Sequence, residues 1–453
     1  MPGRFRNVRT WLWGLVIAAV AVAGCGGGAS GNQAGQSTQK VKLVYFNARA
    51  ADPVEQALVK RYMQDHPNVT IEYLATTAMP GPSDTDAIAN LIFNIQAKTT
   101  VDVAKVEISR TPLDLMAARS IQDLAQIGGD AVNQQLKGLL NTNYVSFDRG
   151  VWALPYEYDP FGYVYNASLF QAAGISSPPK TWDDMRRVNR TILQKFPGTW
   201  PICHPIQNLS KMQPYVWSAG GTYWDRDLLP KRADFQNPGI VAAYSFAQEW
   251  AQSNWTNTSD ITSTNSIQWM ISRKCAAMDY SAALAVTLRV NDPSQDWRVA
   301  ATPVKDASFK ATNFAGGSAL VVPSTSKYPR AALDFILWLT SREGQSLKYG
   351  VDNSLGLAKQ DVFNEATPSS RDVGSRLTGN PDWKQALATS GVPTRPSGVS
   401  PAYSRAYQLL ADMQQRILLK RSSVDQELGS TQGAVQQLID DSMQKNPELY
   451  RSR

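Results

Sequence analysis

The chain has 453 residues, of which 43% are hydrophobic, and it carries a formal net charge of +7. This length allows two or three domains with sizeable cores, and the apolar content excludes an intrinsically disordered protein. The positive charges are spread along the sequence without a basic block, so nucleic acid is not an expected partner.

Residues 1–24 have the features of a targeting signal. Three arginines and no acid precede the apolar stretch 11–23, which is too short to span ~30 Å of hydrocarbon as a permanent helix. Removal of this segment takes away only those three arginines among the charged residues and lowers the net charge from +7 to +4.

The end of this segment predicts a lipid anchor. It reads Val-Ala-Gly-Cys and resembles a bacterial lipobox, in which the cysteine, here Cys25, becomes the acylated first residue. The glycine-rich, polar segment 25–40 would then be a flexible tether to the outer face of a membrane. An ordinary cleavage site followed by a chance cysteine is the alternative.

Two cysteines remain, Cys203 and Cys275. An even pair in an exported chain predicts a disulfide, and two buried free thiols are the alternative. No metal or other cofactor is expected, because the chain has only two histidines and no paired-cysteine motif.

The first part of the exported chain alternates strand and helix patterns. Residues 40–46, 69–74 and 101–106 predict strands, and a helix between the first two begins at Asp52 with proline at the next position. Such alternation indicates parallel strands and an α/β fold, whose ligands bind beyond the carboxyl ends of strands. The residues that follow the first and third strands, Asn47, Arg49 and Glu107, are therefore candidates for a ligand site.

The stretch 150–185 is the most informative part of the sequence. It begins as an alternating strand that ends at Pro155, and Glu157 and Asp159 follow, each beside a tyrosine. A second apolar run leads into a helix that ends at Gly174. Thr181, with an aspartate three residues later, then predicts the start of another helix.

Later segments add further patterns. Residues 213–225 are rich in aromatics around a Gly-Gly pair, 267–280 read as a helix followed by a strand, and 314–318 are Phe-Ala-Gly-Gly-Ser. An amphipathic helix is expected at 331–340, and two helices, the first of which includes Tyr403, close the chain after Arg395.

The motifs ALPY, YNASLFQAAG, PPKTWD and IQWMISRKCAAMDY resemble, in order and distance, those of the extracellular solute-binding proteins (family 1, sugar-binding type) of bacterial ABC importers. The resemblance implies the type II periplasmic-binding-protein-like α/β fold, in which two lobes are joined by crossing segments with the ligand cleft between them. The expected first lobe is 41–157 plus 298–339, and the second is 158–297 plus 340–453, with the third crossing near Thr340.

The resemblance and the strand-end rule together give the expected ligand residues. Polar groups for sugar hydroxyls are Glu107, Glu157, Asp159 and Arg395, and aromatic faces are Tyr156, Trp217, Tyr223 and Tyr280. The other candidates are Asn47, Arg49, Asp279, Gly316 and Gly317. Structural roles are the alternatives: core packing for Trp217 and Tyr223, a hinge ion pair for Glu157 or Asp159, and a loop cap for Arg395.

The implied function is capture of a carbohydrate by hinge closure and its delivery to an ABC permease, by a monomer anchored on the cell surface or periplasmic side and without catalysis. Two alternatives stay open. A glycerol phosphate or phosphodiester could use Arg49, Arg395 and the Gly316–Gly317 turn, although three acids oppose an anion. A secreted glycoside hydrolase could use Glu157 and Asp159 as its acid and base.

Overall fold

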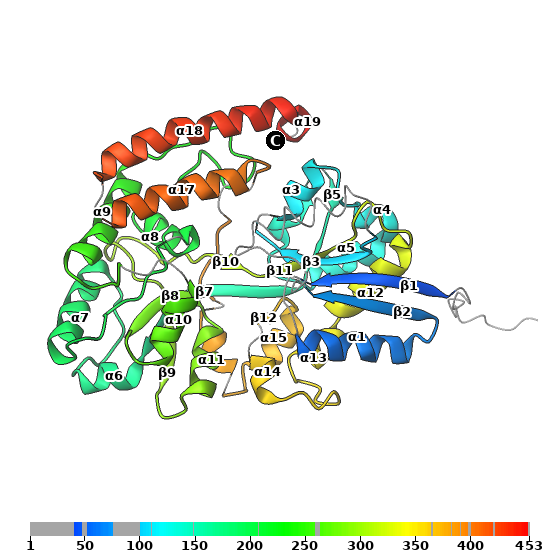
Figure 1. Cartoon of the computed structure of the whole chain (residues 1–453), viewed down its shortest axis with the longest axis horizontal. Coiled ribbons are helices and arrows are strands. Elements are labelled where there is room, and N and C mark those ends of the chain that lie inside the picture. Colours follow the sequence, from blue (N-terminus) through cyan, green and yellow to red (C-terminus); the bar gives the residue numbers. More distant parts are fainter. Residues whose placement is uncertain are drawn as a thin grey trace, which may run out of the picture. The chain divides into compact units, whose positions relative to one another are not determined.

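Besides the two-stranded pair β4–β5, two five-stranded sheets are built from strands that come from distant parts of the sequence (Figure 1). The computed structural model describes residues 40–47, 52–75, 100–109, 111–147, 149–206, 208–258, 263–363, 366–381, 383–389, 391–396, 400–419 and 422–451. All of them belong to the unit Lys40–Arg453. The predicted signal segment, Cys25, Arg49 and nearly all of the tether lie outside the described residues.

The first sheet has the strand order β2-β1-β3-β11-β6. Its members are β2 (Val69–Ala75), β1 (Val41–Asn47), β3 (Val103–Glu107), β11 (Ser318–Val321) and β6 (Leu154–Pro155). The first three strands are parallel, whereas β11 runs antiparallel to both β3 and β6. The strands predicted near 40–46, 69–74 and 101–106, and their parallel arrangement, are confirmed.

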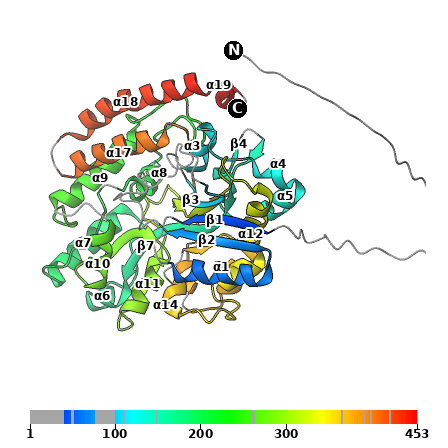
Figure 2. The ribbon, with the colours of Figure 1, turned by 45° about the vertical axis from the view of Figure 1, so that its right-hand side comes forward.

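Alternating side chains give this sheet two apolar faces. Leu43 and Tyr45 pack toward α1 (Pro53–Asp65) and α12 (Pro329–Thr340), which are drawn beside the sheet in Figure 2. Phe46 points to the opposite core, which includes residues of α3 (Thr111–Ala117). Both faces are thus buried by helices, as expected for parallel strands.

Local capping signals in the sequence are also confirmed. The Asp52 carboxylate accepts hydrogen bonds from the backbone N–H groups of Val54 and Glu55, and proline occupies the first helical position of α1. Thr181 and Asp184 form a reciprocal capping box at the start of α7 (Trp182–Lys195).

The second sheet is organised around β7 (Glu157–Asn166). The first half of β7 pairs with β10 (Ala315–Gly316) and β12 (Thr367–Pro368), and the second half pairs with β8 (Ala277–Ser281) and β9 (Trp297–Ala300). One face is covered by α7, α8 (Gln213–Trp217), α9 (Pro238–Gln252), α17 (Tyr403–Leu418) and α18 (Val424–Lys445). The other packs on α11 (Leu284–Asn291).

Three chain segments meet at the junction of the two sheets. β6 continues through Tyr156 into β7, and β10 continues through Gly317 into β11 as the antiparallel partner. The third segment is β12, and not the predicted Thr340 region. Ser341 instead caps α13 (Arg342–Lys348), which packs on α1 and α12 and so stays beside the first sheet.

The predicted lobe ranges therefore differ from the sheets. β9 lies in the range assigned to the first lobe, but it pairs with β7 in the second sheet. α13 lies in the range assigned to the second lobe, but its neighbours are α1 and α12. In both cases the chain crosses later than the resemblance implied, since burial against either sheet requires the same kind of residues.

The remaining elements connect these layers. They are α4 (Leu124–Gly128), α5 (Asp130–Lys137), η2 (Thr142–Tyr144), β4 (Ser146–Phe147), β5 (Gly150–Val151), α6 (Ala167–Ala172), η3 (Leu209–Lys211), α10 (Ser263–Ile271), α14 (Lys359–Phe363), α15 (Arg371–Leu377), α16 (Trp383–Ala386) and α19 (Pro447–Arg451). Within the described parts of the chain, no helix combines the length and apolarity that a membrane crossing requires.

Candidate ligand-binding site

Aromatic side chains gather beside Asp159, where β7 enters the second sheet. Phe161, Trp217 and Phe314 form one small apolar cluster, in which the Phe161 and Phe314 rings meet edge to face at 5.1 Å. Tyr280 of β8, which is only half-buried, stacks with Phe161 at a centroid distance of 6.0 Å. The structure thus brings together the predicted residues Trp217, Tyr280 and Asp159.

The Asp159 carboxylate is partly exposed and has a local partner. The hydroxyl of Ser281 donates a hydrogen bond to it, and in the sheet Asp159 lies opposite Gly316. A partly exposed carboxylate beside an aromatic ring can bind a hydroxylated ring at its edge while the aromatic ring contacts its face.

Two members of this cluster were missed from the sequence. Phe161 follows Asp159 by two residues, so the period of a strand places it on the same face, and this signal was available. Phe314 immediately precedes the Ala-Gly-Gly segment, but only the pairing of β10 with β7 brings it to Phe161.

Lys211 is the third residue that sequence reasoning missed. It ends η3, is only 1% exposed, and places its Nζ 3.6 Å from the Phe161 ring centre and 3.7 Å from that of Tyr280. Burial lowers the pKa of Lys211 to about 7, although the carboxylates of Asp159 and Asp279 oppose this effect. Nothing in its surroundings along the sequence distinguishes this lysine from a surface residue.

Asp279, a predicted ligand residue, is an interior group in this structure. It is 2% exposed and accepts hydrogen bonds from the hydroxyls of Tyr215 and Thr302, the latter at 3.0 Å. Burial raises the pKa of Asp279 to about 7, although both hydroxyls and Lys211 lower it. The carboxylate therefore faces the protein interior and not a ligand.

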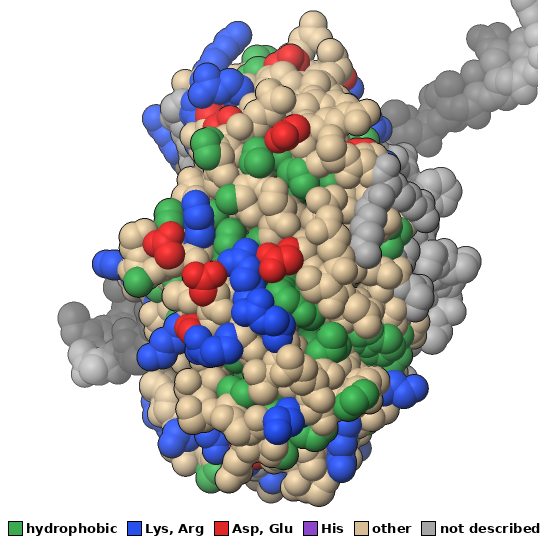
Figure 3. Space-filling view, turned by 90° about the vertical axis from the view of Figure 1, so that its left-hand side faces the viewer, with side chains coloured by type: hydrophobic (Ala, Val, Ile, Leu, Met, Phe, Trp, Pro, Cys, Tyr) green, Lys and Arg blue, Asp and Glu red, His purple; other side chains and the backbone are tan. Residues whose placement is uncertain are grey.

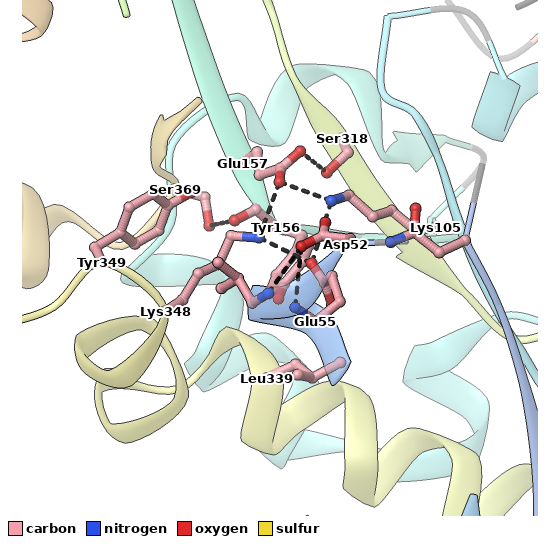
Figure 4. A network of polar contacts seen from close by, with 12 residues as sticks. Asp52, Glu55, Lys105, Tyr156, Glu157, Ser318, Leu339, Lys348, Tyr349 and Ser369 are labelled. Atoms are coloured by element: carbon pink, nitrogen blue, oxygen red, sulfur yellow. Dashed lines mark hydrogen bonds and ion pairs between the residues drawn. The ribbon is translucent and has the colours of Figure 1, made fainter. Parts of the chain in front are cut away.

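Glu157 belongs to a buried cluster of four charges (Figure 4). Its Oε1 lies 2.7 Å from Lys105 Nζ and 3.0 Å from Lys348 Nζ, and both lysines also contact Glu55, at 3.2 and 2.8 Å. The Ser318 hydroxyl donates to the other Glu157 oxygen at 2.6 Å. Both carboxylate oxygens of Glu157 therefore bind other residues of the protein, and its role is the structural alternative, a hinge ion pair.

The same cluster explains why Tyr156 is not exposed as an aromatic face. The side chain is completely buried, with its ring 4.4 Å from Lys348 Nζ and 5.2 Å from Lys105 Nζ. Cation–π contact with two buried ammonium groups stabilises this position. Tyr156 is therefore a core residue of the first sheet.

Opposite charges hold Glu55 ionised. Its burial raises the pKa, but the Lys348 and Lys105 ammonium groups outweigh burial and lower the pKa of Glu55 to about 2. The Tyr45 hydroxyl also donates to Glu55, at 3.0 Å. The cluster ties α1, β3 and α13 to the beginning of β7.

Three further predicted residues have internal partners. Tyr223 is fully buried and shares a hydrogen bond of 2.9 Å with Tyr244, so the core alternative holds for it. Arg395 donates to Asp227 at 2.6 Å and lies 5.8 Å from the Trp217 ring centre. Asn47 is 1% exposed and donates to the Tyr73 hydroxyl at 2.9 Å.

Glu107 remains at the carboxyl end of β3 and is partly exposed. Its Oε1 accepts hydrogen bonds from the backbone and hydroxyl of Ser109, at 3.0 and 2.6 Å. The position agrees with the strand-end rule. Arg49, which that rule placed nearby, lies outside the described residues.

The Gly316–Gly317 pair serves the chain crossing. Gly317 has φ +124, and a Cβ there would collide with the carbonyl oxygen of Glu157. A Cβ on Gly316 would meet only the Phe314 ring edge, at 3.4 Å. The sequence predicted that a ligand approaches the backbone at this glycine pair. At Gly317 that space is instead occupied by the backbone of Glu157.

Cys203 and Cys275 form a disulfide with a Cα–Cα distance of 5.9 Å. The Cys203 N–H also donates to the carbonyl of Ala277 at 2.8 Å. These contacts fasten the segment before η3 to the start of β8. Among the described residues, no group of three or more His, Cys, Asp or Glu side chains is placed to hold a metal ion.

Surface depressions lie elsewhere on the described part of the chain. Two, of about 590 and 440 Å³, adjoin α6 and the segment before β9, and one of about 360 Å³ lies between α7 and α9. None of them is lined by a predicted ligand residue. Figure 3 looks onto the α7 side and shows basic and acidic side chains next to one another. In α7, Arg186 pairs with Asp183 at 2.7 Å and with Glu249 of α9 at 2.8 Å.

A family model described as "Bacterial extracellular solute-binding protein" matches residues 49–346. This chain belongs to that family. Membership assigns a binding role, and not a catalytic one, to an extracellular solute-binding protein.

Relatives and solved structures agree with this assignment. Diacetylchitobiose binding protein DasA of Streptomyces coelicolor is 25% identical over 350 residues, which cover 71% of this chain and 78% of that protein. An ABC transporter solute-binding protein of Thermotoga lettingae, solved with α-D-tagatose, has a TM-score of 0.72 at 18% identity and covers 88% of this chain and 100% of its own.

The GacH receptor of Streptomyces glaucescens, solved unliganded and with acarbose, has a TM-score of 0.72 at 19% identity, with 89% and 99% of the two chains covered. At such identities these structures establish the fold, which is the predicted periplasmic-binding-protein α/β fold.

Proposed function

We propose that this solute-binding protein is the substrate-binding lipoprotein of an ABC importer for a neutral mono- or oligosaccharide. The sugar is held between two lobes that close about the three crossing segments, and the closed form delivers it to the membrane permease. Lipid on Cys25 keeps the protein at the membrane surface.

The observation that carries this proposal is the aromatic cluster beside Asp159. Tyr280 offers a partly exposed flat ring beside the buried rings of Phe161, Trp217 and Phe314, and Asp159 offers hydroxyl acceptors next to it. This is the combination that a sugar ring requires, since its C–H faces are apolar and its edge carries hydroxyls. The names of the relatives, which bind diacetylchitobiose, tagatose and acarbose, support the same ligand class.

The contacts disfavour a phosphate ligand. Arg395 is engaged by Asp227, and the space next to Gly317 is filled by the Glu157 carbonyl. Hydrolysis of a glycoside is likewise disfavoured, because Glu157 is enclosed by Lys105 and Lys348 and is 3% exposed. A buried carboxylate of this kind cannot reach a glycosidic bond.

A thermal-shift and calorimetry panel tests the proposal. The exported chain, residues 26–453, is titrated with diacetylchitobiose, maltose, tagatose, acarbose, mannitol and glycerol phosphates. A sugar at 100 times its Kd is expected to add ~2.7 kcal/mol to the free energy of unfolding. A shift with glycerol phosphates alone, no shift with any sugar, or release of monosaccharide during incubation would contradict the proposal.

The anchor has its own test. The wild-type full chain should be found in the membrane fraction of the cells that express it, and a Cys25→Ser variant should be found in the soluble fraction. Mass spectrometry should find acyl chains on the wild-type protein and none on the variant. Equal membrane association of both forms would exclude the lipid anchor.

A further inference from the structure

Lys211 is a buried cation that the sugar-binding proposal does not yet use. Its ammonium lies between two rings of the candidate site, 3.6 Å from the centre of Phe161 and 3.7 Å from the centre of Tyr280. Within the described part of the chain it forms no salt bridge, although only 1% of the residue is exposed. A charge in such a place is costly to bury unless its surroundings compensate it.

The titratable groups around Lys211 come from β7, β8, the segment before η3 and α8. β7 supplies Asp159 and β8 supplies Asp279, and both carboxylates stabilise the ammonium. The segment before η3 supplies His204, which is neutral because burial, and to a smaller extent Lys211, lower its pKa to about 3. From α8, Tyr215 donates its hydroxyl to Asp279.

The two carboxylates near Lys211 differ in their exposure. Asp279 accepts hydrogen bonds from two hydroxyls and is 2% exposed, so its charge is screened from a ligand. Asp159 is partly exposed at the site. The Lys211 ammonium and the Asp159 carboxylate therefore stabilise each other at the partly exposed side of the site.

We propose that Lys211 determines specificity at this site: its ammonium balances Asp159 and so makes the site selective for neutral sugars over sugars that carry a protonated amino group. The inference rests on the proposed sugar-binding function. A sugar ring packed on Tyr280 would lie on the order of 7 Å from the ammonium, where repulsion between two positive charges at low solvent exposure lowers affinity ~10-fold or more.

The test compares matched neutral and cationic ligands. The probes are N,N′-diacetylchitobiose against de-N-acetylated chitobiose, and maltose against 6-amino-6-deoxymaltose, titrated calorimetrically at pH 6 into the exported chain. The quantity measured is the ratio of the Kd of the cationic sugar to that of its neutral counterpart. A ratio is insensitive to a general loss of active protein.

Three variants give the expected pattern. Lys211→Met should lower the ratio ~10-fold or more, because Asp159 then attracts the cation, and Lys211→Arg should keep the wild-type ratio. Lys310→Met, which removes an exposed lysine, is the matched control and should change nothing. Circular dichroism and melting temperature confirm that each variant is folded.

A fourth variant tests the inference even if the Lys211 variants do not fold. Asp159→Asn removes one of the two carboxylates that stabilise the ammonium, so it should raise the ratio ~10-fold even though it weakens binding of both sugars. An unchanged ratio in Lys211→Met or in Asp159→Asn would overturn the inference. Failure of the wild-type chain to bind any neutral probe would instead contradict the proposed function.

Discussion

Ionisable residues near the sheet junction fall into two groups that differ in their partners. Glu55, Glu157, Lys105 and Lys348 neutralise one another in the interior, so none of their charges is available to a ligand. Asp159 and Lys211 are arranged differently, with one partly exposed carboxylate and one buried ammonium beside aromatic rings. Partner and burial, and not residue type, separate structural from ligand-facing charges.

Glu55 should make the protein sensitive to acid. Its pKa of about 2 lies below that of an unfolded glutamate, so the stabilisation is complete above about pH 4.5 and is lost as the pH falls toward 2. The loss amounts to about 3 kcal/mol. The free energy of unfolding is measured in urea at pH 7, 4.5 and 3. For Glu55→Gln it should be lower than that of the wild type at pH 7 and should fall less as the pH decreases.

The control for Glu55 is Glu72→Gln, which removes an exposed carboxylate that pairs with Lys42 at 2.8 Å. Exposed pairs contribute little, so this variant should keep the wild-type pH dependence. If Glu55→Gln also keeps it, the charge cluster does not supply the predicted stability.

Asp159→Ala should weaken sugar binding ~10-fold or more, because the lost acceptor leaves ligand hydroxyls unpaired. Calorimetry with the best sugar of the panel measures this. Asp306→Ala, in an exposed loop, is the comparison and should bind normally. Wild-type affinity in Asp159→Ala would remove Asp159 from the site.

At the scale of elements, the antiparallel pair formed by β6–β7 and β10–β11 connects the two sheets. The pair is held close by the hydrogen bond from Tyr156 N–H to Ser318 O, 2.8 Å long, and by the contact of Gly317 with the Glu157 carbonyl. The disulfide adds a second fixed point, where the segment before η3 joins β8. Lys211 follows that segment, so its position depends on this attachment.

Gly317→Ala should therefore be much more harmful than Gly316→Ala. The first introduces a Cβ at φ +124 against a carbonyl oxygen, whereas the second adds only a contact of 3.4 Å with the Phe314 ring. We expect a loss of more than ~2 kcal/mol for Gly317→Ala and within ~1 kcal/mol for Gly316→Ala. Urea unfolding of both variants checks this, and equal losses would show that the crossing tolerates a side chain.

At the scale of the whole described unit, each sheet has its own cores on both faces, and only a few segments join them. α19 is an additional link, because Leu449 and Tyr450 pack into the core that contains Phe46 and Val106 of the first sheet. Separate cores joined by few segments permit rigid-body rotation of one sheet with its helices against the other.

Closure should be visible in solution. A saturating sugar is expected to reduce the radius of gyration measured by small-angle X-ray scattering, because a ligand that bonds both lobes favours the closed state. Asp159→Ala at the same sugar concentration, or a sugar that gives no thermal shift, should leave the radius unchanged. A wild-type radius that does not respond to a bound sugar would exclude hinge closure.

Much of the fold followed from local patterns. Strand alternation, the caps at Asp52 and Thr181, and the ordered motifs predicted the α/β family fold, because these features depend on residues close in the chain. Asp159, Trp217 and Tyr280, which were predicted as ligand residues, lie near one another in the structure, and their role in binding stays a prediction.

The tertiary structure alone decided which polar and aromatic groups are used internally. Glu157 and Tyr156 are enclosed by Lys105 and Lys348, which come from β3 and α13. Lys211 becomes part of the site only because η3 is placed against Phe161 and Tyr280. Burial and charge pairing are set by contacts between distant segments, so a sequence pattern predicts the elements but not which of their charges are exposed to a ligand.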